Sequence, residues 1–175
     1  MAYYALRTND QSVISTILNS NIGTQLQFGN LSWYLNKIAL NDICFIKISG
    51  DDAAKQITYD NSLVAIAKII STPYNIHIPA NKKTNHGTID IEIIQIFQNI
   101  TANELYKYPT LKNTLSIGAS TKGMPNQAIG RLSKGQAEDI IKALINENRL
   151  NNTFLASMNI TNRNLDILTQ STIIV

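Results

Sequence analysis

The chain has 175 residues, 44% of them hydrophobic, which is enough for one domain with its own core and a short additional segment. Only 15% of the residues are charged, and the formal net charge of +3 is a weak indication of a polyanionic partner. The start of the chain lacks the basic and apolar regions of a signal peptide, and no apolar run reaches the length of a membrane span. We therefore expect a soluble, cytoplasmic protein with no membrane partner.

The first element expected is a strand followed by a helix. YYALR at residues 3–7 predicts a short strand, because tyrosine and other large side chains favour extended backbone. Asn9 or Asp10 can cap a helix over residues 11–20, where apolar side chains recur at helical spacing. Residues 23–39 fit either a strand or a helical turn.

The middle of the chain predicts a sheet. The apolar run at 43–48 follows a turn and is typical of a central strand, and residues 62–71 form a second strand of the same kind. We expect a polar loop over 49–61 between them. Residues 73–88 contain two prolines and a glycine and predict another loop, with a short edge strand at IHI.

The last third predicts one strand and two helices. Residues 89–100 alternate as a strand does, and a capping box from Thr101 to Glu104 begins a short helix. A longer helix is expected within 130–149, capped by Ser133. The whole order predicts an α+β fold, a bent and partly closed β-barrel with flanking helices.

A phosphate-binding loop is excluded at GASTKGMPNQ, residues 118–127. Gly118 and Gly123 have the spacing of a P-loop, but Met124 and Pro125 occupy the places of its lysine and hydroxyl residue. We therefore expect this stretch to be a polar loop with no role in nucleotide hydrolysis.

Other catalytic and metal-binding patterns are weak. His77 and His86 have no accompanying cysteine cluster or helical zinc motif, so no metal or other cofactor is expected. Cys44 is the single cysteine and lies in the apolar run ICFIKI, which favours a buried thiol over a nucleophile. Asp51 and Asp52 are most simply explained as a solvated turn. We predict that this chain alone is not an enzyme.

The only tryptophan, Trp33, stands in the polar and aromatic stretch FGNLSWY. Such a residue can stack on a nucleic-acid base. It can equally anchor a core with its indole N–H bonded, and composition alone favours that second interpretation.

The order of these segments resembles the EVE and YTH group of the PUA-like superfamily over residues 3–147. The resemblance rests on YYALRTN with its following helix, GNLSW, NDICFIKISGD, SLVAIAKIIS, IDIEIIQIFQNITANELYKYPTLKN and MPNQAIGRLSKGQAEDIIKAL. It implies a bent barrel-like sheet that binds nucleic acid. In several members one modified base is flipped out into an aromatic pocket.

The resemblance also implies a set of site residues. Trp33 matches the pocket tryptophan, Asn30 and Ser32 can reach the base edge, and Ser49 ends a strand that lines the pocket. Further candidates are the closing-loop residues Asn126 and Gln127, the aromatic walls Tyr4, Tyr34 and Tyr59, and the acid Asp51. Phosphate contacts are expected from Lys82, Lys83, Lys122 and Arg131.

The resemblance further implies a place in a larger assembly. We expect residues 1–147 to be a nucleic-acid-binding domain and 148–175 to be a polar linker and C-terminal segment leading to a following domain. Similar domains precede the GTP-hydrolysing motor of McrB-like restriction proteins, so the expected function is reading of a modified base in double-stranded DNA, with motor and nuclease subunits as partners. Two alternatives remain open at this stage, an RNA-binding domain of the same fold and an interaction or scaffold domain.

Overall fold

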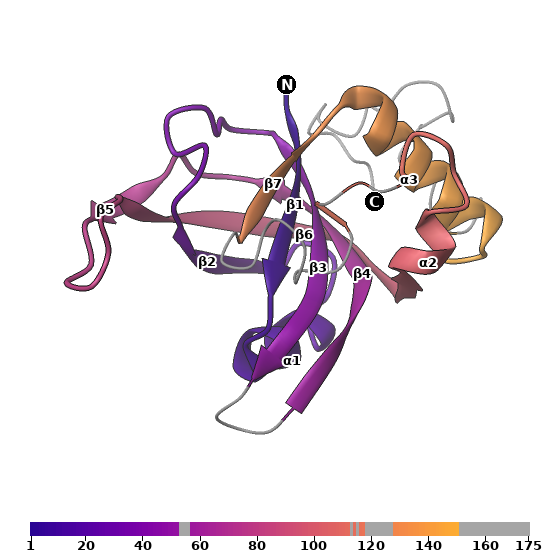
Figure 1. Cartoon of the computed structure of the whole chain (residues 1–175), viewed down its shortest axis with the longest axis horizontal. Coiled ribbons are helices and arrows are strands. Elements are labelled where there is room, and N and C mark those ends of the chain that lie inside the picture. Colours follow the sequence, from indigo (N-terminus) through magenta and orange to yellow (C-terminus); the bar gives the residue numbers. More distant parts are fainter. Residues whose placement is uncertain (53–56, 113, 115, 118–127, 151–175) are drawn as a thin grey trace.

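The computed structural model describes residues 1–52, 57–112, 114, 116, 117 and 128–150, with the backbone alone at 50–52 and 57–59. Within these ranges the chain forms one curled sheet with a few helices around it (Figure 1). The strands are β1 Tyr3–Thr8, β2 Gln25–Leu31, β3 Ile43–Asp52, β4 Ile57–Ile69, β5 Tyr74–His77, β6 His86–Thr101 and β7 Ile129–Leu132. The helices are α1 Gln11–Leu18, α2 Ala102–Leu105 and α3 Lys134–Asn146.

The strands are hydrogen-bonded in the order β2-β6-β4-β3-β1-β7, and β5 pairs with the outer part of β6. β1 runs parallel to β3, with Tyr3 opposite Ile43 and Arg7 opposite Lys47, while the other pairings are antiparallel. The long strands β4 and β6 carry register shifts at several points, and such bulges bend a sheet. The result is a half-barrel, as the fold prediction expected in its coarse form (Figure 1).

Both faces of the central strands are buried. Tyr3 and Ala5 of β1 face a core completed by α2 and α3, where Leu105 and Leu144 are fully buried. Tyr4, the next residue along β1, faces a second core that α1 closes with buried isoleucines. A strand covered on both sides needs a continuous apolar run, which explains why ICFI in β3 carries no polar interruption.

All three helix starts follow local signals in the sequence. Asp10 caps α1, its carboxylate accepting hydrogen bonds from the backbone N–H groups of Ser12 and Val13 at 2.8 and 3.3 Å. Thr101 and Ser133 form the capping boxes of α2 and α3 with the residues three places on. The predictions of these helices are confirmed, because capping uses partners that lie close in the chain.

One local prediction is wrong, and one strand was not predicted. The polar loop expected over 49–61 is mostly strand, since β3 continues to Asp52 and β4 begins at Ile57. Residues 129–132 precede the expected cap Ser133 of the last helix, and no strand was predicted for them; they form β7, which pairs with β1. Pairing with distant strands decides both segments, and it leaves little trace in local composition. The expected edge strand near IHI is present as β5, whereas 118–127 and 151–175 lie outside the described residues.

Within the described part of the chain, none of the helices has the length and apolar character needed to cross a membrane.

Candidate functional site

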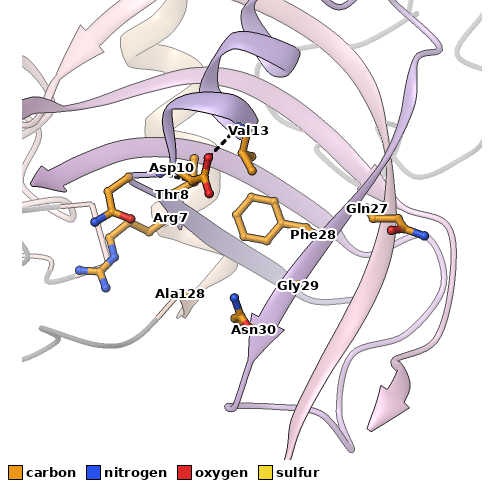
Figure 2. Close-up of a pocket in the computed structure, with 10 residues that line it drawn as sticks. Arg7, Thr8, Asp10, Val13, Gln27, Phe28, Gly29, Asn30 and Ala128 are labelled. Atoms are coloured by element: carbon orange, nitrogen blue, oxygen red, sulfur yellow. Dashed lines mark hydrogen bonds between the residues drawn. The ribbon is translucent and has the colours of Figure 1, made fainter. Parts of the chain in front are cut away.

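A pocket of about 260 Å³ lies where the end of β1 meets β2, the first turn of α1 and the start of β7 (Figure 2). Three stretches of the chain that are far apart in the sequence, 7–13, 27–30 and Ala128, therefore converge on it. The described residues that line it are Arg7, Thr8, Asn9, Asp10, Val13, Gln27, Phe28, Gly29, Asn30 and Ala128.

The wall formed by the β1–α1 turn is held by hydrogen bonds. The backbone N–H of Asp10 donates to the Thr8 hydroxyl at 3.2 Å, and the Asp10 carboxylate caps α1. The backbone N–H of Arg7 donates to the Ala128 carbonyl at 2.8 Å, which ties β7 to the same end of β1. The Asp10 carboxylate in the pocket lining therefore already accepts two hydrogen bonds from backbone N–H groups of α1.

Phe28 supplies the aromatic surface of the pocket. Its side chain is buried, and Figure 2 shows its ring between β2 and the turn that carries Thr8 and Asp10. The neighbouring side chain of Gln27 points to the other side of the strand, as alternation along a strand requires. The sequence prediction missed Phe28 as a site residue. A signal was present, because Leu26 and Phe28 are the apolar positions of an alternating QLQF stretch.

Asn30 is the one predicted base-edge residue among those that line the described pocket. Its backbone φ of 59° lies in the left-handed region, which asparagine tolerates better than most residues. Two residues on, Ser32 is partly buried but is not among the described lining residues. The left-handed backbone at Asn30 accompanies a register irregularity of β2 against β6 between Phe28 and Leu31.

Trp33 lies elsewhere. Its side chain is 53% exposed and does not belong to the described lining of the pocket. The alternative that it anchors the core is therefore wrong, and its role in a base pocket stays a prediction. Its neighbour Tyr34 turns inward with a φ of 60° and packs on Tyr4, with 5.6 Å between ring centroids. Segment 32–38 thus uses a tyrosine, and not the tryptophan, to cover the second core.

Tyr4 is fully buried and is not among the described lining residues of the pocket, so its role as an aromatic wall stays a prediction. Burial raises the pKa of its phenol, and the guanidinium of Arg131 lies 5.5 Å from its ring centroid. Arg131 is on the edge strand β7 directly opposite Tyr4 and is exposed to solvent. A phosphate contact by Arg131 stays a prediction.

The remaining predicted residues are spread over the molecule. Ser49 is buried, and its hydroxyl has no hydrogen-bond partner within the described structure. Lys82 and Lys83 are exposed in the turn between β5 and β6. Nothing is described of the side chains of Asp51 and Tyr59, or of Lys122, Asn126 and Gln127.

Metal and nucleophile chemistry finds little support in the described residues. They contain no group of three or more His, Cys, Asp or Glu side chains placed to hold a metal ion. His77 and His86 are cross-strand partners in β5 and β6, and His77 Nδ1 is bonded to the Asn75 carbonyl at 2.8 Å. Cys44 is buried in β3, where burial raises the pKa of its thiol.

Comparison with known proteins identifies the fold but no family. No protein-family model and no curated protein matches the sequence. Solved structures do match, among them a crystal structure of a protein from Pseudomonas putida, with a TM-score of 0.60 and 13% identity over 82% of this chain and 100% of that one. The NMR structure of Rpa0253 from Rhodopseudomonas palustris has a TM-score of 0.54 and 14% identity over 82% of this chain and 92% of that one.

A third similar structure is the crystal structure of Atu2648 from Agrobacterium tumefaciens. Its TM-score is 0.51 and its identity 10%, over 81% of this chain and 92% of that one. At such identities the similarity establishes a shared fold. The chain therefore has the half-barrel α+β fold of these bacterial proteins.

Proposed function

We propose that this chain is a nucleic-acid-binding module of the EVE and YTH type that takes a single base into the pocket beside Phe28. The observation that carries the proposal is the pocket itself, a cavity of about 260 Å³ at the polar end of an otherwise apolar half-barrel. Sites for drug-sized ligands usually measure about 300–1,000 Å³, so this pocket suits a smaller group such as one planar base.

The chemistry of the lining fits a base better than a fully apolar ligand. Phe28 offers an aromatic surface, and a base removed from its stack regains part of the lost energy on such a surface, about 1–3 kcal/mol. Thr8, Asn9 and Asn30 offer hydroxyl and amide groups that match donors and acceptors on a base edge. A site of this kind discriminates mainly through hydrogen bonds that the wrong base leaves unpaired.

The finer assignment rests on the sequence resemblance. It places the chain as the target-recognition domain of an McrB-like restriction system that reads a modified base in double-stranded DNA. A methyl group on the base would add about 1 kcal/mol of apolar contact, so the shape of the pocket must contribute much of the selectivity. Motor and nuclease subunits are the partners that this assignment implies.

A titration of four fluorescent duplexes tests the proposal. The probes are unmodified DNA, 5-methylcytosine DNA, N6-methyladenine DNA and an RNA duplex, each at two salt concentrations. We expect one modified DNA to bind more tightly than the unmodified duplex. Asn30→Gly removes the amide without straining the left-handed backbone and should weaken that preference by up to about tenfold.

The matched control is Asn148→Gly. Asn148 also has a left-handed backbone, with φ at 60°, but it follows α3 and is not among the described lining residues. It should leave binding unchanged. Preference for the RNA duplex would replace the DNA assignment with the RNA-binding alternative. Failure of all four probes to bind at low salt would leave an interaction or scaffold domain.

A further inference from the structure

A second polar cluster lies at the same end of the sheet as the pocket. Along β1 and β3, the residues facing the α2–α3 core are Tyr3 and Ala5, and Ile43 and Phe45. Continuing the same alternation, the next residues on this face are Arg7 in β1, and Lys47 and Ser49 in β3. The apolar face thus ends in two cations and a hydroxyl.

The two cations are neighbours across the parallel strand pair. Arg7 is the register partner of Lys47, so their side chains start from adjacent points on one face. Lys47 is only 2% exposed, and lysine is rarely buried to that degree. Burial, together with the charge of Arg7, lowers the pKa of Lys47 to about 8, so that it is mostly protonated at neutral pH.

The groups around the cations offer further polar atoms. The Ser49 hydroxyl is 1% exposed and makes no hydrogen bond to a described residue. Across the β3–β4 pair, Ser49 lies between the registered pairs Ile48–Ser62 and Gly50–Tyr59, opposite the two residues Asp60 and Asn61 at a register shift. The side-chain Oδ1 of Asn61 is also buried without a partner among the described residues. Oxygen and nitrogen of an amide are interchangeable by a flip, which would present its NH₂ group to the same space.

Guanidinium, ammonium, hydroxyl and amide N–H groups together are the donors that bind a phosphate group. Arg7 connects this set to the pocket, because it also belongs to the pocket lining. In Figure 2 the side chain of Arg7 extends away from the Phe28 ring. Arg7 is partly exposed and forms the open side of the cluster, with Lys47 and Ser49 behind it.

We propose that Arg7, Lys47 and Ser49 form a phosphate-binding site for the nucleic-acid backbone, next to the nucleotide whose base enters the Phe28 pocket. The inference rests on the proposed function and names different residues from the lysines of the β5–β6 turn. It predicts that backbone binding is centred on the carboxyl ends of β1 and β3. In the view of Figure 1 these ends extend away from α2 and α3.

A single-stranded oligonucleotide of abasic sites tests the phosphate site independently of the base pocket. It has phosphates but no bases, so a base-binding defect cannot affect its affinity. We expect it to bind with an affinity that falls as salt rises, because each neutralised phosphate releases counterions. The slope of the logarithm of the binding constant against the logarithm of the salt concentration is negative. Arg7→Gln and Lys47→Met should each reduce its magnitude by about 0.7, the value for one phosphate contact on a single strand.

Lys142→Gln is the control for loss of one positive charge. Lys142 is exposed on α3 and pairs with Asp139, and its removal should leave the slope unchanged. Asn30→Gly should also leave the abasic slope unchanged, even if it abolishes preference for a modified base. The phosphate site is refuted if the abasic strand does not bind at low salt. It is equally refuted if Arg7→Gln and Lys47→Met give the same slope as Lys142→Gln.

Loss of base preference would leave this result standing. If no modified duplex is preferred but the abasic slopes fall as expected, the base-reading function is wrong and the phosphate site is supported. If a modified duplex is preferred and the abasic slopes do not change, the base-reading function is supported and the phosphate site is wrong. The two proposals can therefore fail separately.

Discussion

Alanine substitutions of Phe28 and of Trp33 should lower the stability of the protein by different amounts, because Phe28 is buried and Trp33 is exposed. Phe28 is 5% exposed within the second core, and deleting a buried phenylalanine side chain costs about 3–5 kcal/mol of unfolding free energy. Trp33 is 53% exposed, so its deletion removes far less packing and should cost less than about 1 kcal/mol. For a chain of this size, about 1 kcal/mol corresponds to roughly 2–4 °C in Tm.

Thermal unfolding followed by far-ultraviolet circular dichroism measures both costs as changes of Tm. Tryptophan fluorescence is unsuitable, because Trp33 is the only tryptophan and one variant removes it. We expect Phe28→Ala to lower Tm by at least about 6 °C and Trp33→Ala by less than about 4 °C. Phe28→Leu is a milder companion that keeps an apolar side chain while removing the aromatic ring.

Equal losses of stability from Phe28→Ala and Trp33→Ala would refute the assignment of Phe28 as the buried aromatic residue and of Trp33 as the exposed one. The binding consequences differ as well. Phe28→Leu should reduce base-dependent binding while the fold persists, since a leucine offers no stacking surface. Trp33→Ala should leave the affinity for the base unchanged, because the exposed indole is not part of the described pocket lining.

Three further predictions concern buried charge and the buried thiol. Burial lowers the pKa of Lys47 to about 8 in the fold, against 10.5 for an exposed lysine, so the unfolded state holds more protons between these values and stability rises with pH there. Relative to Lys47→Met, the wild type should therefore gain stability from pH 7.5 to 10, by at most about 3 kcal/mol, in urea titrations; a constant difference contradicts the pKa shift. Arg149→Met should cost about 1–3 kcal/mol in the same assay, because its guanidinium lies 3.0 Å from a Glu104 carboxylate oxygen and also donates to backbone carbonyls. Lys142→Met should cost under about 0.5 kcal/mol, because the Lys142 side chain is exposed, and equal costs would refute the distinction. Cys44 should react with a thiol reagent only at the rate of unfolding, because its sulfur is buried and burial raises the pKa of the thiol; rapid reaction of the native protein would show that the strand opens locally.

The parts of the fold that the sequence predicted correctly depend on local chemistry. Asp10, Thr101 and Ser133 each cap a helix through backbone groups two or three residues away, so their effect is visible in a short window. The strand β7 depends instead on pairing with β1, more than 120 residues earlier in the chain. Its four residues, IGRL, carry no periodicity that distinguishes a strand from the first turn of a helix.

The site was predicted in part for the same reason. Asn30 could be named from its place in a polar and aromatic stretch, and it does line the described pocket. Whether Phe28 or Trp33 faces the interior depends on where β2 ends and on the left-handed backbone of Asn30 and Tyr34. Composition does not show these backbone conformations. It points to Trp33 as the inward-facing aromatic residue only because Trp33 is the single tryptophan of the chain.

The two proposed sites follow from one property of β1, which is that both of its faces become polar at the end where Lys47 and Ser49 make one face of β3 polar as well. Tyr3 to Leu6 are buried on alternate sides, and then Arg7 and Thr8 follow where further apolar residues would extend both cores. Polar groups at buried strand positions cost stability unless they find partners, and Ser49 has none among the described residues. A fold under selection for stability alone would have no reason to keep them there. A base on the Thr8 side and a phosphate on the side of Arg7 and Ser49 would make use of these polar groups, and a single nucleotide carries both.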